Sequence, residues 1–240
     1  LVKSMDKVGG LATGTSDRVS AKKQVALLKK VMPNLKKVGI MYTTNERNSE
    51  IQVQEAEAAF KEAGIETVVK GISSTNDVQD TTKSLMSQTE ALFIPADNTI
   101  VSAITLVTDL SKEMKVPVVG GSVDVVDDGV LFTYGADFEA LGRQTAKMAI
   151  RIMNGEKVDD ISAEDPETLK AVANKEMAQL LGIDISAIEQ EEQANAQTKK
   201  TTQKSSSTKN TANPKVNSLS KSKSSDSSGG LLDIVLSALS

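Results

Sequence analysis

Two residue types that carry much of the acid–base, nucleophilic and metal chemistry of enzymes are absent from this sequence of 240 residues. It contains no histidine and no cysteine, which excludes Ser-His-Asp and Cys-His triads, zinc sites built from imidazole or thiolate, and disulfides. A carboxylate pair, a lysine Schiff base or a metal site of oxygen ligands is still possible. These absences weaken the case for an enzyme without excluding one. Our expectation is a protein that is not an enzyme and that has no catalytic residues, no cofactor and no bound metal.

Polar side chains gather instead in four loops that each follow a short apolar run. Their hydroxyl, amide and carboxylate groups suit the binding of a small polar ligand. Ser, Thr, Asn and Asp are also the usual N-cap residues of helices, so each loop could serve only to start a helix. The four loops are 43–49 (TTNERNS), 73–76 (SSTN), 96–99 (ADNT) and 120–124 (GGSVD).

Two of these loops suggest the recognition of an amino acid. Asp97 and Asn98 follow the apolar run ALFIP without a cationic neighbour in the sequence, so the carboxylate could hold a ligand ammonium. The turn Gly120-Gly121-Ser122 exposes backbone N–H groups before a helix, which suits a ligand carboxylate. No phosphate-binding loop of the form GxxxxGK[ST] is present, and Gly9-Gly10 lacks the spacing of a dinucleotide fingerprint.

The hydrophobic pattern predicts the elements that position these loops: a doubly wound α/β fold with a parallel sheet and right-handed crossovers. Ligands bind beyond the carboxyl ends of the strands in such sheets, where all four loops would lie. The expected strands are 37–42, 66–69, 91–95, 116–119, 130–133 and 169–172, and the expected helices are 17–31, 49–63, 77–88, 98–114 and 136–153.

Charge and composition change near residue 196. Residues 196–240 carry seven lysines and two aspartates, a net charge of +5, which leaves −9 on residues 1–195. Serine and threonine dominate 198–228, so we expect a disordered linker over 196–230. The apolar segment 231–240 (LLDIVLSALS) is most simply a cut end, although it could also begin a helix or dock on a partner.

Nucleic acid is not an expected partner, and the membrane is not expected to be crossed. Aromatic residues make up only 2% of the chain and its net charge is −4, which suits neither the stacking of bases nor the binding of phosphates. No apolar run approaches the roughly 18 residues of a membrane-spanning helix, and no signal peptide is visible.

Several blocks of the sequence resemble the substrate-binding proteins of ABC transporters of the tryptophan-binding TrpX type. The resemblance implies a two-lobed fold of the type I periplasmic-binding kind that captures a solute, an aromatic or other apolar amino acid, between its lobes. It also implies delivery to a permease with its ATPase subunits, and a place in the periplasm or on the outer face of the cytoplasmic membrane. The blocks are LVKSMDKVGGLATGTSD, VGIMYTTNERNSE, ALFIPADNTIVSA, VPVVGGSVDVVDDGVLFTYGADFEALGRQTAKMAIRIMNGE and LKAVANKEMAQLLGI.

The resemblance further implies that most of the first lobe, together with the lipid anchor of the family, precedes the given chain. Residues 1–17 and 130–156 are expected to be the remnant of lobe one, and 18–127 with 160–190 to form lobe two. The helix over about 136–153 should then expose Leu141, Met148 and Ile152. Ligand-binding residues carried over from the family's cleft-facing segments are Thr15, Ser16, Asp97, Asn98, Ser122, Asp124 and Asp137.

Alternatives remain at this point. Asp137 could simply cap a helix, and Tyr134 could be a core aromatic at the hinge. A ligand-sensing effector domain of the lactose-repressor kind shares the expected fold, and an enzyme of flavodoxin-like architecture is a third option. A helix-turn-helix upstream would favour the repressor, whereas a signal sequence with a cysteine would exclude it.

Overall fold

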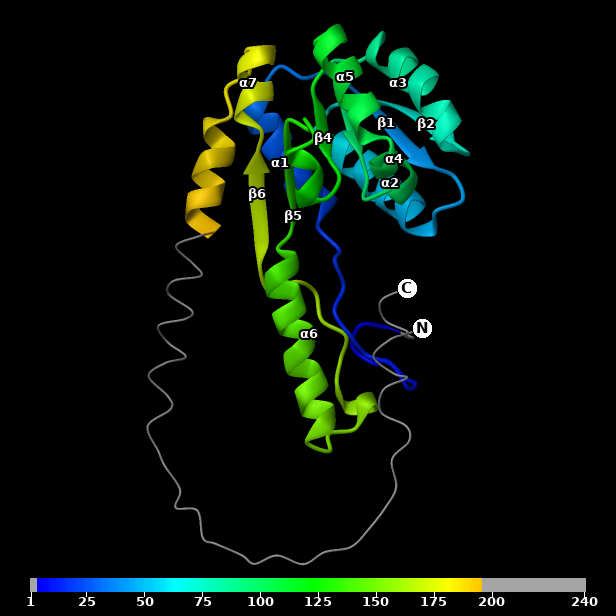
Figure 1. The fold of residues 1–240 in the computed structure, drawn as a ribbon, viewed down its shortest axis with the longest axis vertical. Helices are drawn as coiled ribbons and strands as arrows, with labels where there is room; N and C mark the ends of the chain where they lie inside the picture. Colours follow the sequence, from blue (N-terminus) through cyan, green and yellow to red (C-terminus); the bar gives the residue numbers. More distant parts are fainter. Residues whose placement is uncertain (1–3, 196–240) are drawn as a thin grey trace, which may run out of the picture. The chain divides into compact units, whose positions relative to one another are not determined.

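The computed structural model describes residues 4–195 and contains one six-stranded sheet (Figure 1). Its strand order is β2-β1-β3-β4-β5-β6, and the first five strands are parallel. The predicted α/β class with a parallel-dominated sheet is therefore confirmed. The linker and the apolar segment expected over 196–240 lie outside the described residues. The strands are β1 Lys37–Thr43, β2 Glu66–Ile72, β3 Ala91–Ile94, β4 Val118–Gly120, β5 Phe132–Ala136 and β6 Leu169–Ala173.

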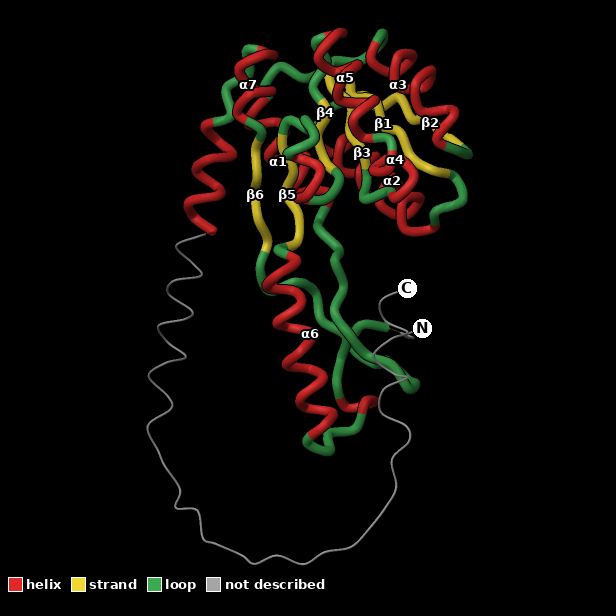
Figure 2. The backbone as a smooth tube through the Cα atoms, viewed as in Figure 1, coloured by secondary structure: helices red, strands yellow, loops and turns green. Residues whose placement is uncertain are grey.

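Helices cover both faces of the sheet (Figure 2). The predicted helix over 98–114 is divided into two at Ala103, whose ψ of 18° departs from helical geometry. The helices are α1 Ala21–Val31, α2 Arg47–Glu62, α3 Val78–Met86, α4 Asn98–Ser102, α5 Ile104–Met114, α6 Phe138–Met153 and α7 Lys175–Leu181, with short 3-10 turns η1 Thr75–Asp77, η2 Val123–Val126 and η3 Val158–Asp160.

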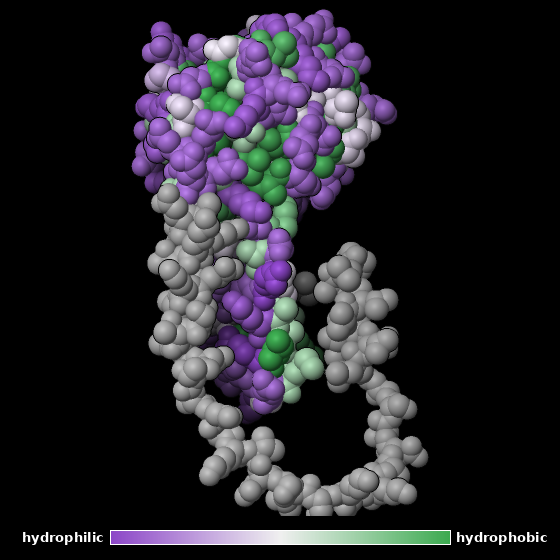
Figure 3. Space-filling view, turned by 60° about the vertical axis from the view of Figure 1, so that its left-hand side comes forward, coloured by the Kyte–Doolittle hydropathy of each residue, from purple (hydrophilic) through white to green (hydrophobic). Residues whose placement is uncertain are grey.

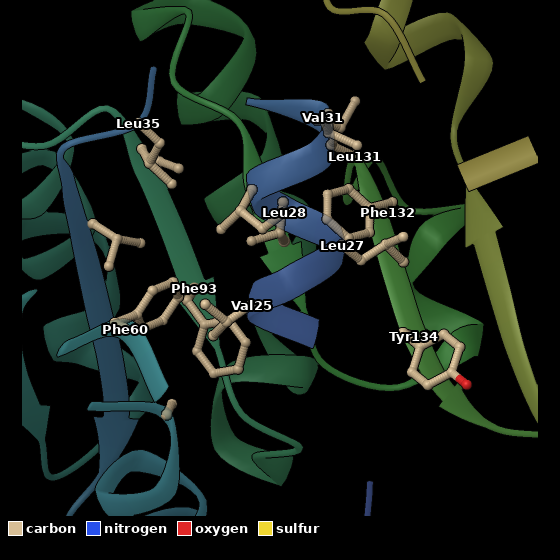
Figure 4. Packing of buried hydrophobic residues seen from close by; sticks show 14 of the residues in the cluster. Val25, Leu27, Leu28, Val31, Leu35, Phe60, Phe93, Leu131, Phe132 and Tyr134 are labelled. Carbon is tan, nitrogen blue, oxygen red and sulfur yellow. The ribbon is translucent and has the colours of Figure 1, made fainter. Parts of the chain in front are cut away.

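Two hydrophobic cores lie on opposite faces of the sheet, because successive side chains of a strand point to opposite sides. In β3, Phe93 joins the core beneath α1 and α2, whereas Leu92 and Ile94 join the core beneath α3 and α5. Phe93 packs edge-to-face on Phe60 of α2, with ring centroids 5.7 Å apart (Figure 4). Burial on both faces explains why the strands read as continuous apolar runs.

The last strand departs from the expected parallel pairing. β6 pairs with β5 in antiparallel register, and Leu169 lies opposite Ala136 at the carboxyl end of β5. The reason is that α6 continues beyond that end of β5 and does not fold back over the sheet (Figure 1). The chain returns through residues 154–168 and re-enters the sheet at the end it left.

The lobe boundary expected at residue 130 lies just before a strand of the sheet. Phe132–Ala136 is a sheet strand that pairs with both β4 and β6, so the segment that leaves the sheet begins only after Ala136. All described residues fall in one compact unit. The assignment of the N-terminal segment and α6 to a first lobe stays a prediction.

The expected exposure of α6 is partly wrong. Met148 is only 3% exposed and Leu141 is half-buried, whereas Ile152 is exposed. The N-terminal segment lies beside this helix, with the hydroxyls of Thr15 and Thr145 2.6 Å apart, and it is joined to the return segment by Thr13 Oγ1, which donates to the carbonyl of Ile161 at 2.9 Å. Apolar atoms are visible at the surface in the lower part of the molecule, where α6 and the segments beside it lie (Figure 3). The exposed large apolar residues of α6 are Phe138, Ile150, Ile152 and Met153.

Candidate functional site

A surface pocket lies beyond the carboxyl ends of the parallel strands, where the fold predicts ligand binding. Its empty volume is about 520 Å³, part of which is open solvent. The end of β3, the turn after β4 and the junction of β5 with α6 line it, and α1 and α2 contribute polar side chains. The residues that matter for its chemistry are Asp17, Gln24, Gln52, Glu55, Phe93, Ser122 and Phe138.

The charged residues that line this pocket are both acids. Asp17 precedes α1 and is exposed, and Glu55 on α2 is half-buried. Glu55 also pairs with the guanidinium of Arg18, which does not line the pocket. A wall of this kind attracts a cationic group of a ligand.

Two of the six aromatic residues of the chain line the pocket. Phe93 is 4% exposed and belongs to the core, whereas Phe138, the first residue of α6, is 46% exposed. The pocket therefore offers apolar as well as acidic surface to a ligand.

The carboxylate of Asp97, predicted to bind a ligand ammonium, is buried and bonded to neighbouring residues of the chain. Its side chain is 1% exposed and does not line the pocket. One carboxylate oxygen accepts from the N–H of Thr43 at 2.7 Å, and the other accepts from the Thr43 hydroxyl at 2.7 Å and from the N–H of Ile100 at 3.0 Å. Asp97 thus joins the end of β1 to the start of α4, which favours the helix-cap interpretation.

Asn98 belongs to the same loop and is held by a residue that the sequence did not single out. Both its backbone N–H and its side-chain amide donate to Glu46, at 3.0 and 3.2 Å. Thr99 donates to the other carboxylate oxygen through its N–H and its hydroxyl. Burial opposes the ionisation of Glu46, but these hydrogen bonds outweigh it and lower the pKa of the carboxyl group.

The glycine turn after β4 forms part of the pocket, as expected, and Ser122 lines it. Gly120 has a φ of +98°, and a Cβ there would lie 2.3 Å from the carbonyl oxygen of Ile94, so only glycine fits without strain. The Thr133 hydroxyl donates to the carbonyl of Gly121 at 3.0 Å and holds the turn in place. Asp124 is exposed and does not line the pocket.

The three remaining candidates flank the pocket without lining it. Thr15 shares a 2.6 Å hydrogen bond with the hydroxyl of Thr145, and the hydroxyl of Ser16 accepts from the N–H of Arg18. Asp137 is 2% exposed, caps α6 by accepting from the N–H of Ala140, and pairs with the ammonium of Lys170 at 2.9 Å.

Sequence reasoning therefore found the pocket's segments better than its residues. Of the seven candidates only Ser122 lines the pocket, although Asp17, Ala96 and Phe138 are direct neighbours of Ser16, Asp97 and Asp137. Gln24, Gln52 and Glu55 were missed, because polar residues on an amphipathic helix read as a solvated face. Their spacing did not distinguish them from other polar residues on the solvent-exposed face of a helix.

Within residues 4–195, no group of three or more acidic residues is placed to hold a metal ion, and no helix has the length and apolarity to cross a membrane. Both statements apply to the described part of the chain alone.

Known proteins resemble this chain both in sequence and in structure. A family model for ABC transporter substrate binding proteins matches residues 1–196. The tyrosine-binding protein of Clostridioides difficile (strain R20291) is 35% identical over 181 residues, which are 75% of this chain and 52% of that protein. The chain thus spans about half the length of this curated relative.

Two solved structures at 35% identity are similar in fold. An ABC domain from Streptococcus pneumonia in complex with L-Trp has a TM-score of 0.73, over 79% of this chain and 66% of that one. A ligand-free, open substrate-binding protein with adhesive properties from Clostridium difficile has a TM-score of 0.66, over 77% and 62%. Because the family model covers most of the chain, the protein belongs to the ABC transporter substrate-binding protein family.

Proposed function

We propose that this chain is the solute-binding component of an ABC import system and that it captures an aromatic or other apolar amino acid. The observation that carries the ligand class is the composition of the pocket. Asp17 and Glu55 supply negative charge for an ammonium group, no lysine or arginine lines the pocket, and Phe93 with Phe138 supplies apolar surface. Relatives named for tyrosine binding, or solved with L-Trp, support the same class.

The mechanism is binding without covalent chemistry. A ligand that contacts surfaces on two lobes stabilises the closed form relative to the open form, and a permease with its ATPase subunits reads that difference. The described pocket supplies one of these surfaces. The protein would act in the periplasm or on the outer face of the cytoplasmic membrane, where a lipid anchor on the full-length protein would hold it.

The effector domain of a lactose-type repressor is the alternative, and the comparisons favour it less. The relatives at 35% identity carry the words tyrosine-binding, ABC domain and substrate binding in their descriptions. Nothing in the pocket calls for catalysis.

Calorimetric titration of the full-length protein with the twenty amino acids, a sugar series and a nucleoside series tests the proposal. We expect micromolar or tighter binding of an aromatic or apolar amino acid. Binding of a sugar or a nucleoside with no response to any amino acid would refute the ligand class.

A further inference from the structure

The helix α2 presents two polar side chains to the pocket from one face. Gln52 and Glu55 both line the pocket, and they are three residues apart in the helix. Residues at this spacing are neighbours on a helix surface, with Cβ atoms about 5–6 Å apart. One is an amide and the other a carboxylate, so together they offer a donor and an acceptor.

The orientation of the Gln52 amide follows from its contact with Ala96, which also lines the pocket. The backbone N–H of Ala96 donates to Oε1 of Gln52 at 2.9 Å. Because an N–H group requires an acceptor, this contact identifies the oxygen end of the amide. The Nε2 end has no hydrogen bond to another residue in the described range 4–195, and it therefore supplies the pocket with N–H donors.

Gln52 is held in this position because two side chains of α2, Asn48 and Gln52, bind the backbone of Ala96. The carbonyl of Ala96 accepts from Nδ2 of Asn48 at 2.8 Å, one helical turn before Gln52. A swing of Gln52 away from the pocket would break its bond to the Ala96 N–H. A donor fixed in this way binds a ligand with little loss of side-chain entropy.

Glu55 supplies the complementary group. Its carboxylate can only accept hydrogen bonds, and its side chain is 31% exposed. The exposed Arg18 is its partner, and exposed ion pairs of this kind are weak. A ligand ammonium in the pocket can therefore share this carboxylate.

We propose that Gln52 and Glu55 together bind the head group of an α-amino acid. Nε2 of Gln52 donates to the ligand carboxylate, and the carboxylate of Glu55 accepts from the ligand ammonium. The two ligand groups are attached to one carbon atom, and adjacent turns of one helix face can reach both. This inference rests on the proposed function and assigns to α2 the role that was predicted for Asp97 from its place in the sequence.

The test compares three probes in NMR titrations of the ¹⁵N-labelled chain: L-tryptophan, tryptamine, which lacks the carboxylate, and indole-3-propionate, which lacks the ammonium. The variants are Gln52→Glu, which keeps an acceptor for the Ala96 N–H, and Glu55→Gln. Gln54→Glu is the control for the first, because Gln54 is exposed on the same helix. Glu62→Gln is the control for the second, because Glu62 also lies on α2 and pairs with an exposed cation, Lys22, outside the pocket.

We expect the unaltered chain to prefer tryptophan to tryptamine by about tenfold or more, the scale of a charge-assisted hydrogen bond. Gln52→Glu should abolish or reverse that preference, and Glu55→Gln should abolish the preference for tryptophan over indole-3-propionate. The controls should change neither ratio. The side-chain N–H signals of Gln52 in the unaltered chain should shift with tryptophan and indole-3-propionate but not with tryptamine.

The possible failures are separable. Binding of tryptophan with unchanged ratios in both variants and no shift of the Gln52 side-chain signals would overturn this inference and leave the proposed function standing. Absence of binding of any amino acid to the unaltered chain and to the full-length protein would overturn both. If only the full-length protein binds, the same probes and variants are compared in it, and the same outcomes decide. The Gln52 signals give a decision even where a variant fails to fold, because they are measured on the unaltered chain.

Discussion

Replacement of Asp97 by alanine separates a structural role from a ligand-binding role. The substitution removes the acceptor of three hydrogen bonds and leaves the N–H and hydroxyl of Thr43 and the N–H of Ile100 without that partner at a buried site. Loss of a helix cap costs about 1 kcal/mol, and each buried donor left unpaired costs about 1–3 kcal/mol. Partial relaxation lets water reach some of these donors, so we expect a loss of about 2–4 kcal/mol in the free energy of unfolding.

Urea denaturation followed by circular dichroism measures this loss as a lower midpoint at an unchanged slope. Asp124→Ala is the matched control, because Asp124 is an exposed aspartate in a neighbouring loop, and its effect should stay within about 0.5 kcal/mol. A double-mutant cycle with Thr43→Val should show coupling of about 0.5–3 kcal/mol between contacting partners. Unchanged stability of Asp97→Ala together with lost affinity for amino acids would refute the reasoning and restore Asp97 as a ligand.

Three further predictions concern other parts of the fold. Hydrogen bonds lower the pKa of Glu46 in the folded state, so its contribution to stability is present above the ordinary pKa of 4.5 and is lost as the pH falls through the folded-state pKa. Glu46→Gln should therefore flatten the pH dependence of urea midpoints measured below about pH 5. The exposed Glu113→Gln is the control and should not flatten it. Gly120→Ala should destabilise the chain by more than about 1 kcal/mol, because Gly120 has a positive φ and lies close to the Ile94 carbonyl. Gly142→Ala, at a helical position with open space around it, should stabilise the chain by about 0.5–1 kcal/mol. Equal effects of the two substitutions in thermal melts would contradict this prediction. The exposed apolar residues of α6 should make the chain self-associate with rising concentration. Because affinity in a two-lobed protein comes from enclosing the solute between two surfaces, and the described pocket supplies one of them, the chain should bind solute weakly or not at all. A monodisperse monomer in sedimentation velocity that binds an amino acid at micromolar affinity or better would contradict both expectations.

The sequence determined the fold class and the edge of the sheet at which the pocket lies. Strands buried on both faces must be continuously apolar, and helices that cover them must be amphipathic, so β1, β3 and β4 and their connecting helices could be recognised from local pattern alone. Parallel pairing then places every loop after a strand at one edge. The glycine turn and Ser122 were found in this way.

Tertiary structure decided which polar groups turn inward and which meet the pocket. Asp97 and Glu46 satisfy backbone donors of segments that are more than 50 residues away in the sequence or that begin α4, and no local pattern reveals where those donors end up. The same holds for Gln52, whose amide is oriented by the backbone N–H of Ala96, and for Met148, which is buried although its helix continues beyond the sheet. Burial and hydrogen bonding at these positions are properties of distant partners brought together by the fold, and they become visible only once the sheet has placed those partners side by side.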